Sequence, residues 1–133
     1  MSYLLDTCTI SDFVKGQPAV LKRTKVTSPT LIFVSSISTM EIEYGLRLNP
    51  ARVQKILPVI QAFLANIQIL PFGNPEAKAA GGIRAALRRQ GSPIGCYDVL
   101  IAGTALAHGL TVVTSNTNEF KRVGGLLLEN WRE

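Results

Sequence analysis

The sequence predicts an α/β domain in which helices cover both faces of a short, mainly parallel central sheet. Its apolar runs, such as Leu31–Val34 and Leu110–Thr114, are short and continuous, as in strands that are buried on both faces. Segments with a helical period separate these runs, which is the order of a parallel sheet with crossover helices. The chain has 133 residues, of which 47% are apolar and 17% charged, so we expect one domain over residues 1–133.

Each strand is predicted from an apolar run that a polar residue or a turn signal ends. Asp6 ends the first run, and Pro71 ends the third. The expected strands cover residues 3–5, 31–34, 67–70, 110–114 and 126–128.

The helices are predicted from apolar residues at helical spacing between start and stop signals. Gly16 and Pro18 split the first helical region, residues 10–26. The next helix is expected to open at Ser38 and to end at Asn49-Pro50. The later helices are expected over residues 51–66, 75–90 and 97–107, with a short one around residues 119–121.

The composition indicates which classes of partner the protein binds and in which cell compartment we expect it. The net charge is +5, from 14 Lys and Arg against 9 Asp and Glu, which favours a polyanionic partner or an acidic protein. Cys8 and Cys96 are too few for a disulfide scaffold, and we expect both to be small buried residues. The chain has neither a signal peptide nor an apolar run of about 20 residues, so we expect a cytoplasmic protein that does not enter a membrane.

Acidic residues are placed where strands end and helices begin. Asp6 follows the first strand, Glu41 lies in the first turn of the expected second helix, and Asp98 lies in the first turn of the helix before the fourth strand. Asn116 and Glu119 come just after that strand. Ligands of parallel sheets bind beyond the carboxyl ends of the strands, so we expect these side chains to meet there.

Carboxylates that share a pocket need a cation. Two charges about 4 Å apart repel by roughly 4 kcal/mol at an effective dielectric near 20. An all-oxygen ligand set selects Mg²⁺ or Mn²⁺, and such an ion activates water against a phosphodiester. The hydroxyls of Thr114 and Ser38 lie beside the expected pocket, where they would orient an acid or cap a helix.

Each acid also has a purely structural interpretation. Asp6 would start a turn, Glu41 would complete a capping box with Ser38, and Asp98 would interact with a helix dipole. Asn116 and Glu119 would form another cap. Only the convergence of these residues in one pocket favours a site over separate caps.

Four segments carry a resemblance to a known family. They are Leu4-Leu5-Asp6-Thr7 and residues 35–45, 94–102 and 113–131. The first three resemble the motifs of PIN domains, and the last resembles the tail of the VapC toxins. The resemblance covers nearly the whole chain in the same order.

The resemblance implies a PIN-like three-layer α/β/α fold with four to five strands. It implies an Mg²⁺- or Mn²⁺-dependent endoribonuclease, the toxin of a VapBC-type pair, which forms a homodimer and is blocked by a VapB-like antitoxin. The RNA substrate would be tRNA or another structured RNA. Asp6, Glu41 and Asp98 match the catalytic, metal-binding acids of the family. The fourth acid falls at or near Asn116, with Glu119 as a substitute and Thr114 as an auxiliary residue.

Other patterns carry weaker predictions. Lys78, Arg84, Arg88 and Arg89 are expected on the outer face of the helix over residues 75–90, either solvated or in contact with RNA or antitoxin. His108 is the only histidine, which excludes a two-histidine ribonuclease mechanism; we expect it to interact with a helix dipole.

Three rival functions are weighed against the nuclease. A haloacid-dehalogenase phosphatase needs Asp-x-Asp, whereas Cys8 follows Asp6 here. A receiver domain needs an aspartate after its third strand, where this chain has Leu70-Pro71. A non-catalytic PIN-like module that binds RNA or protein is the remaining alternative, because Asn116 stands where the fourth acid is expected.

Overall fold

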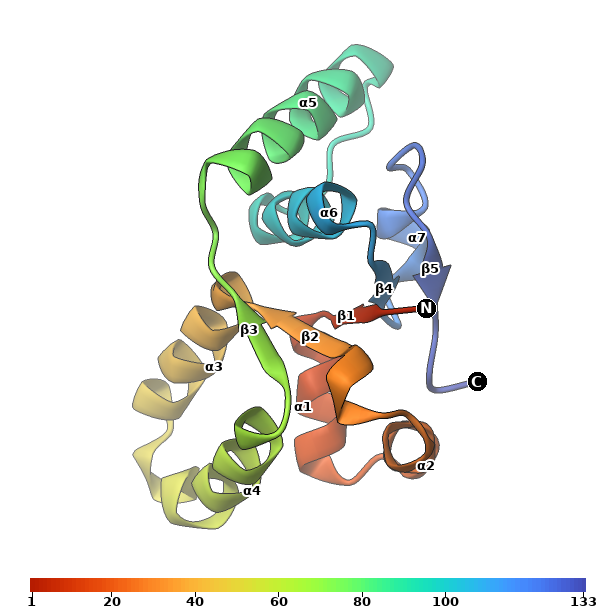
Figure 1. Ribbon diagram of the computed structural model, residues 1–133. Helices are drawn as coiled ribbons and strands as arrows, with labels where there is room; N and C mark the ends of the chain where they lie inside the picture. Colours follow the sequence, from red (N-terminus) through yellow and green to blue (C-terminus); the bar gives the residue numbers. More distant parts are fainter.

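A parallel sheet of five strands forms the centre of the computed structural model, which describes residues 1–133 (Figure 1). The strand order is β3-β2-β1-β4-β5, and every neighbouring pair is parallel. The strands are β1 (Tyr3–Leu5), β2 (Ile32–Ser35), β3 (Gln68–Leu70), β4 (Thr111–Val113) and β5 (Leu128–Glu129). The α/β class and the parallel sheet predicted from the apolar runs are confirmed.

The helices follow the predicted order, and their ends differ from the predicted ones by at most three residues. They are α1 (Thr7–Lys15), α2 (Pro18–Val26), α3 (Ser36–Leu48), α4 (Val53–Ala65), α5 (Asn74–Gln90), α6 (Cys96–His108) and α7 (Thr117–Phe120). Short 3-10 turns at Pro29–Leu31 and Pro50–Arg52 precede β2 and α4. The predicted break between α1 and α2 is present, since Gly16 ends α1 in the left-handed conformation with φ 81°.

Two apolar cores fill the space between the sheet and its helices. Leu4 and Val112 point into a core with α5 and α6, whereas their neighbours Leu5 and Val113 point into a core on the other face. Figure 1 shows α5 and α6 on one side of the strands and α1, α2 and α4 on the other. This alternation explains why successive residues of β1 and β4 are apolar, since each face of the sheet has its own core.

Helices α5 and α6 lie unusually close together at one point. A Cβ atom on Gly103 would lie 2.7–2.8 Å from the backbone N and Cα of Ala80, closer than real side chains approach. Gly103 therefore permits the close contact between the two helices.

Helix α3 begins two residues earlier than predicted. The Ser35 hydroxyl accepts the N–H of Ile37 at 3.0 Å and acts as the N-cap, so the chain enters the helix directly from β2. The predicted start at Ser38 is wrong, because Ser38 is already the third residue of the helix. None of the helices is both long and apolar enough to cross a bilayer.

Candidate active site

Asp6 leaves the end of β1 and caps α1. Its Oδ1 accepts the N–H of Thr9 at 2.8 Å, and the side chain is almost fully buried. Burial raises the pKa of Asp6, while hydrogen bonds from Thr114 and Thr9 oppose that rise. Asp6 therefore caps a helix, whereas its structural interpretation predicted the start of a turn, and it lies at the carboxyl edge of the sheet.

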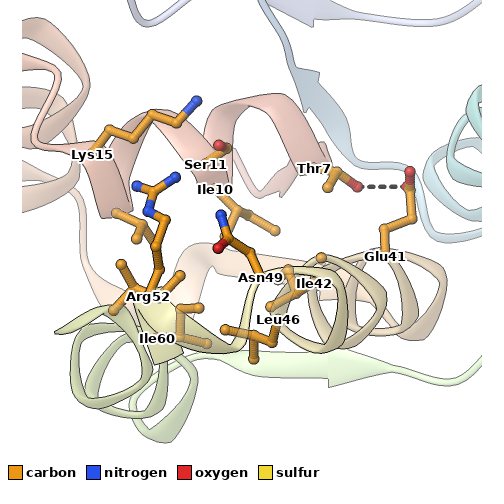
Figure 2. A pocket seen from close by; sticks show the side chains of 13 residues that line it. Thr7, Ile10, Ser11, Lys15, Glu41, Ile42, Leu46, Asn49, Arg52 and Ile60 are labelled. Atoms are coloured by element: carbon orange, nitrogen blue, oxygen red, sulfur yellow. Dashed lines mark hydrogen bonds between the residues drawn. The ribbon is translucent and has the colours of Figure 1, made fainter. Parts of the chain in front are cut away.

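Glu41 lies beside the start of α1. It belongs to the second turn of α3 rather than the first, and Ser38 is not a cap, so the predicted capping box is wrong. Instead, its Oε1 accepts the Thr7 hydroxyl at 2.7 Å (Figure 2), and that hydroxyl is 3.1 Å from the Ser38 hydroxyl. The contact ties α3 to the residue that follows Asp6.

Asp98 and Glu119 approach each other over Gly95. A Cβ atom on Gly95 would lie 3.3 Å from Asp98 Oδ2 and 3.3 Å from Glu119 Oε1, so a larger residue would crowd both carboxylates. Gly95 donates its N–H to Glu119, and Asn116 Nδ2 donates to the other carboxylate oxygen at 2.5 Å. Glu119 is thus held toward Asp98 by two donors.

Three other carboxylates are near enough to Asp98 to affect its pKa. Burial raises the pKa of Asp98 to about 7, with further contributions from the charges of Glu119, Asp6 and Glu41. The pKa of Glu119 is lowered, chiefly by the Gly95 hydrogen bond. Near neutral pH the proton of this pair therefore resides on Asp98. These four acids come from the starts of α1 and α6, from α3 and from α7.

Two features make these residues suitable for a hard cation: their donor atoms are all oxygen, and the four acids lie near one another. As the side chains stand, no three acidic, histidine or cysteine groups are close enough together to make a complete ligand set. The acids face hydroxyl, amide and backbone donors or share a proton, which relieves their repulsion without a cation. The donors are all oxygen, as Mg²⁺ and Mn²⁺ prefer.

Asn116 and Thr114 serve the acids rather than a helix cap. The Asn116 side chain makes no cap hydrogen bond to α7; its amide orients Glu119. Thr114 is fully buried, accepts the backbone N–H of Asn116 at 2.9 Å and lowers the pKa of Asp6.

A buried acid that the sequence analysis missed lies one and a half turns along α1. Asp12 is 7% exposed, and Arg132 donates to its two oxygens at 2.6 and 2.7 Å. Its charge adds to the rise in the pKa of Asp6. No local signal in the sequence points to this pair, because the partner of Asp12 is 120 residues away.

Both cysteines are exposed, so the prediction of burial was wrong. Cys8 and Cys96 lie in the first turns of α1 and α6, whose N-termini open at the edge where the acids gather. Side chains in those turns face solvent as well as the site.

The basic residues and His108 lie on α5 and at the far end of α6. Lys78, Arg84, Arg88 and Arg89 are exposed, as predicted. His108 Nε2 is 2.8 Å from Glu76 Oε2, and Glu76 also accepts the N–H of Gly73 at 2.7 Å. His108 lies in the last turn of α6, at the opposite end of the helix from Asp98.

A groove beside Glu41 runs between α1, α3 and α4. Its cavity volume is about 270 Å³, and its floor is apolar, with Ile10 and Ile60 among the lining residues. Figure 2 shows Thr7 and Glu41 at one end and Lys15 and Arg52 at the other. The groove thus has an acidic end at the candidate site and a basic end away from it.

Comparison with known proteins gives one family. The family model described as PIN domain matches residues 3–126. The chain is 37% identical over 131 residues to the tRNA(fMet)-specific endonuclease VapC of Shigella flexneri, covering 98% of each chain. It is 34% identical to the ribonuclease VapC2 of Haemophilus influenzae, again over 98% of each.

Solved structures agree with the sequence comparison. The fold matches DNA-bound VapBC from Salmonella typhimurium with a TM-score of 0.88 and 36% identity, covering 98% of both chains. It matches VapBC2 from Rickettsia felis, bound to a fragment of its promoter, with a TM-score of 0.90 and 32% identity over 98% and 99% of the two chains.

Proposed function

This chain belongs to the PIN domain family, and we propose that it is a metal-dependent endoribonuclease, the toxin of a VapBC-type toxin–antitoxin pair. The observation that carries the proposal is the gathering of four carboxylates at the carboxyl edge of the sheet, where Asp98 has a pKa near 7 because of burial and its acidic neighbours. The whole chain is proposed to act as one PIN-like domain, since the family model spans most of it.

Asp6, Glu41 and Asp98 are proposed to hold the cation, Mg²⁺ or Mn²⁺. Glu119 is proposed as a further ligand in place of Asn116, because its carboxylate faces Asp98 over Gly95. When bound, a divalent cation supplies positive charge for the phosphate and makes water more acidic.

The neighbouring residues of the chain hold the acids in place, and one of the acids carries a proton near neutral pH. Thr7 fixes Glu41, and the backbone N–H of Thr9 fixes Asp6. Asp98 carries a proton near neutral pH and releases it when positive charge enters the site, while Glu119 stays ionised. The Thr7 hydroxyl and the Thr9 N–H thus orient the carboxylate oxygens in advance.

RNA is the proposed substrate, with tRNA as the first class to test. The relatives from Shigella flexneri and Salmonella typhimurium are named tRNA(fMet)-specific endonucleases. The net charge of +5 favours a polyanion, and the exposed Arg84, Arg88 and Arg89 are proposed contacts for RNA or antitoxin.

A VapB-like antitoxin is the proposed protein partner, and the chain is proposed to form a homodimer. The groove between Glu41 and the pair Lys15 and Arg52 fits a peptide segment with apolar side chains between two charged ones. A cation of that segment would face Glu41, and an anion would face the basic end. Such a segment would cover the approach to the acids.

The test is cleavage of RNA by the purified chain. We expect tRNA to be cut with Mn²⁺ or Mg²⁺ and left intact with excess chelator. Asp98→Asn should abolish cleavage, whereas Glu43→Gln should not, because Glu43 is exposed and paired with Arg47. Binding of tRNA without cleavage under every metal condition would refute the nuclease and favour the non-catalytic module.

A further inference from the structure

A second hollow lies beside the candidate active site, between the end of α5 and the start of α6. Its volume is about 320 Å³, within the usual range of ligand pockets. It is lined by Arg84, Leu87, Pro93, Ile94, Cys96, Val99 and Leu100. Its lining residues Ile94 and Cys96 flank Gly95, whose Cβ position would lie 3.3 Å from Asp98 Oδ2, so the hollow and Asp98 lie on either side of this residue.

The loop that forms one wall of this hollow is fixed in two places. Arg122 Nη1 donates to the carbonyl oxygen of Pro93 at 2.9 Å, and Gly95 donates its N–H to Glu119. Both anchors come from the segment of residues 119–122, which includes Glu119 of α7. The position of this loop is therefore tied to the geometry of the active site.

The chemistry of the lining fits a ligand that has an apolar face and is attached to an anion. Five of the seven lining residues are hydrophobic, and none is acidic. Arg84 is the one cation; it is exposed and takes part in none of the salt bridges of the structure. An arginine guanidinium that makes no ion pair is one of the groups on which proteins stack the unpaired bases of single-stranded RNA.

We propose that this hollow, the Arg84 pocket, binds one nucleobase of the RNA strand next to the phosphate that is cut. The proposal rests on the proposed nuclease function and specifies how that site selects its substrate. A base held here is splayed out of the strand, with Arg84 against its face and Pro93 and Ile94 around it. The adjoining phosphate then lies toward the turn of α6 that carries Asp98.

The experiment is a cycle of protein and RNA changes. In an RNA hairpin that the wild type cuts, each nucleotide near the cleavage position is replaced, one at a time, by an abasic residue. We expect one such replacement to lower kcat/KM about tenfold or more, as for the loss of one stacked base. In the Arg84→Ala variant the same abasic replacement should lower kcat/KM hardly at all, because the side chain that holds the base is already missing.

Two further variants separate base binding from general charge and from folding. Arg89→Ala removes an exposed arginine of α5 that does not line the pocket, so it should weaken cleavage of all the RNAs alike and keep the abasic effect. Ile94→Trp fills the pocket and should bring intact RNA down to the rate of the abasic RNA. Thermal melting confirms that each variant is folded.

The proposal is overturned if no abasic position matters, or if its effect is unchanged in Arg84→Ala. It is also overturned if Arg84→Ala changes only the oligomeric state in size-exclusion chromatography, since the hollow would then belong to a contact between copies. Anisotropy titrations of intact and abasic RNA in chelator report base binding without cleavage. A chain that distinguishes the two RNAs there but never cuts would refute the nuclease function and leave the pocket standing.

Discussion

The pKa of Asp98 gives the sharpest prediction, which concerns metal binding as a function of pH. A carboxylate must be ionised to bind a cation, and burial beside Glu119, Asp6 and Glu41 raises the pKa of Asp98 to about 7. Metal affinity should therefore fall as the pH drops below 7, in a range where an ordinary aspartate would still be fully ionised.

The size of the effect follows from that pKa. With a pKa of about 7, roughly one Asp98 in eleven is ionised at pH 6 and roughly one in a hundred at pH 5. We expect the apparent Mn²⁺ affinity to fall about tenfold per pH unit below 7, with about one proton released per ion bound. The lowered pKa of Glu119 keeps that residue ionised, whereas the raised pKa of Asp6 steepens the fall at the acid end.

The assay is calorimetric titration with Mn²⁺ at several pH values in buffers of different ionisation enthalpy. Glu119→Gln removes the neighbouring charge and should move the midpoint to lower pH, while Glu43→Gln, an exposed acid paired with Arg47, should leave it in place. Affinity that stays level between about pH 5 and pH 7, or binding without proton release, would refute the placement of Asp98 among these acids.

The same pKa predicts how the stability of the metal-free protein changes with pH. The change has the opposite sign to that for an aspartate whose pKa is lowered by a positively charged partner. The folded state binds more protons than the unfolded state between about pH 4 and pH 7, because the pKa of Asp98 is raised on folding. In chelator, Tm should therefore fall as the pH rises through this range, and Mn²⁺ should restore it at neutral pH. A Tm that rises instead would contradict the assignment.

Three other substitutions test the fold and the site separately. Glu41→Gln should keep Tm, since an amide oxygen still accepts the Thr7 hydroxyl, but should abolish cleavage; full cleavage would show a purely structural residue. Gly103→Ala should cost about 2 kcal/mol in urea unfolding because its Cβ meets the backbone of α5, whereas Gly82→Ala, with open space around it, should gain up to about 1 kcal/mol; equal effects would contradict the close contact. Arg122→Ala releases the loop before α6 and should weaken Mn²⁺ binding about tenfold in calorimetry; unchanged affinity would show that the loop needs no anchor.

The order of elements and the edge that carries the site were accessible from the sequence. Short continuous apolar runs predicted the strands, and acids at their ends marked the carboxyl edge of a parallel sheet. Asp6 illustrates this, since it follows β1 directly and lies at that edge. The roles of Asp6, Glu41 and Asp98 in catalysis remain predictions until the variants are measured.

Local patterns failed where a competing contact from elsewhere in the chain was stronger. Ser38 and Glu41 have the spacing of a capping box, yet Ser35 caps the helix and Thr7 takes the carboxylate. The two cysteines were expected to be buried as small apolar residues, yet their helical turns open at the surface. Neither outcome is visible in spacing, because both depend on which segments meet.

The sequence by itself determined which segments become strands and helices and which of their ends carry acids, because periodicity and turn residues act over a few positions. Only the tertiary structure decided that the Gly95 N–H would bind Glu119, which is 24 residues further along the chain, and so hold it against Asp98. It also decided that Asp12 would pair with Arg132, which is 120 residues away. Those pairings depend on the angles and distances at which helices pack on the sheet, and the same packing sets the pKa of Asp98.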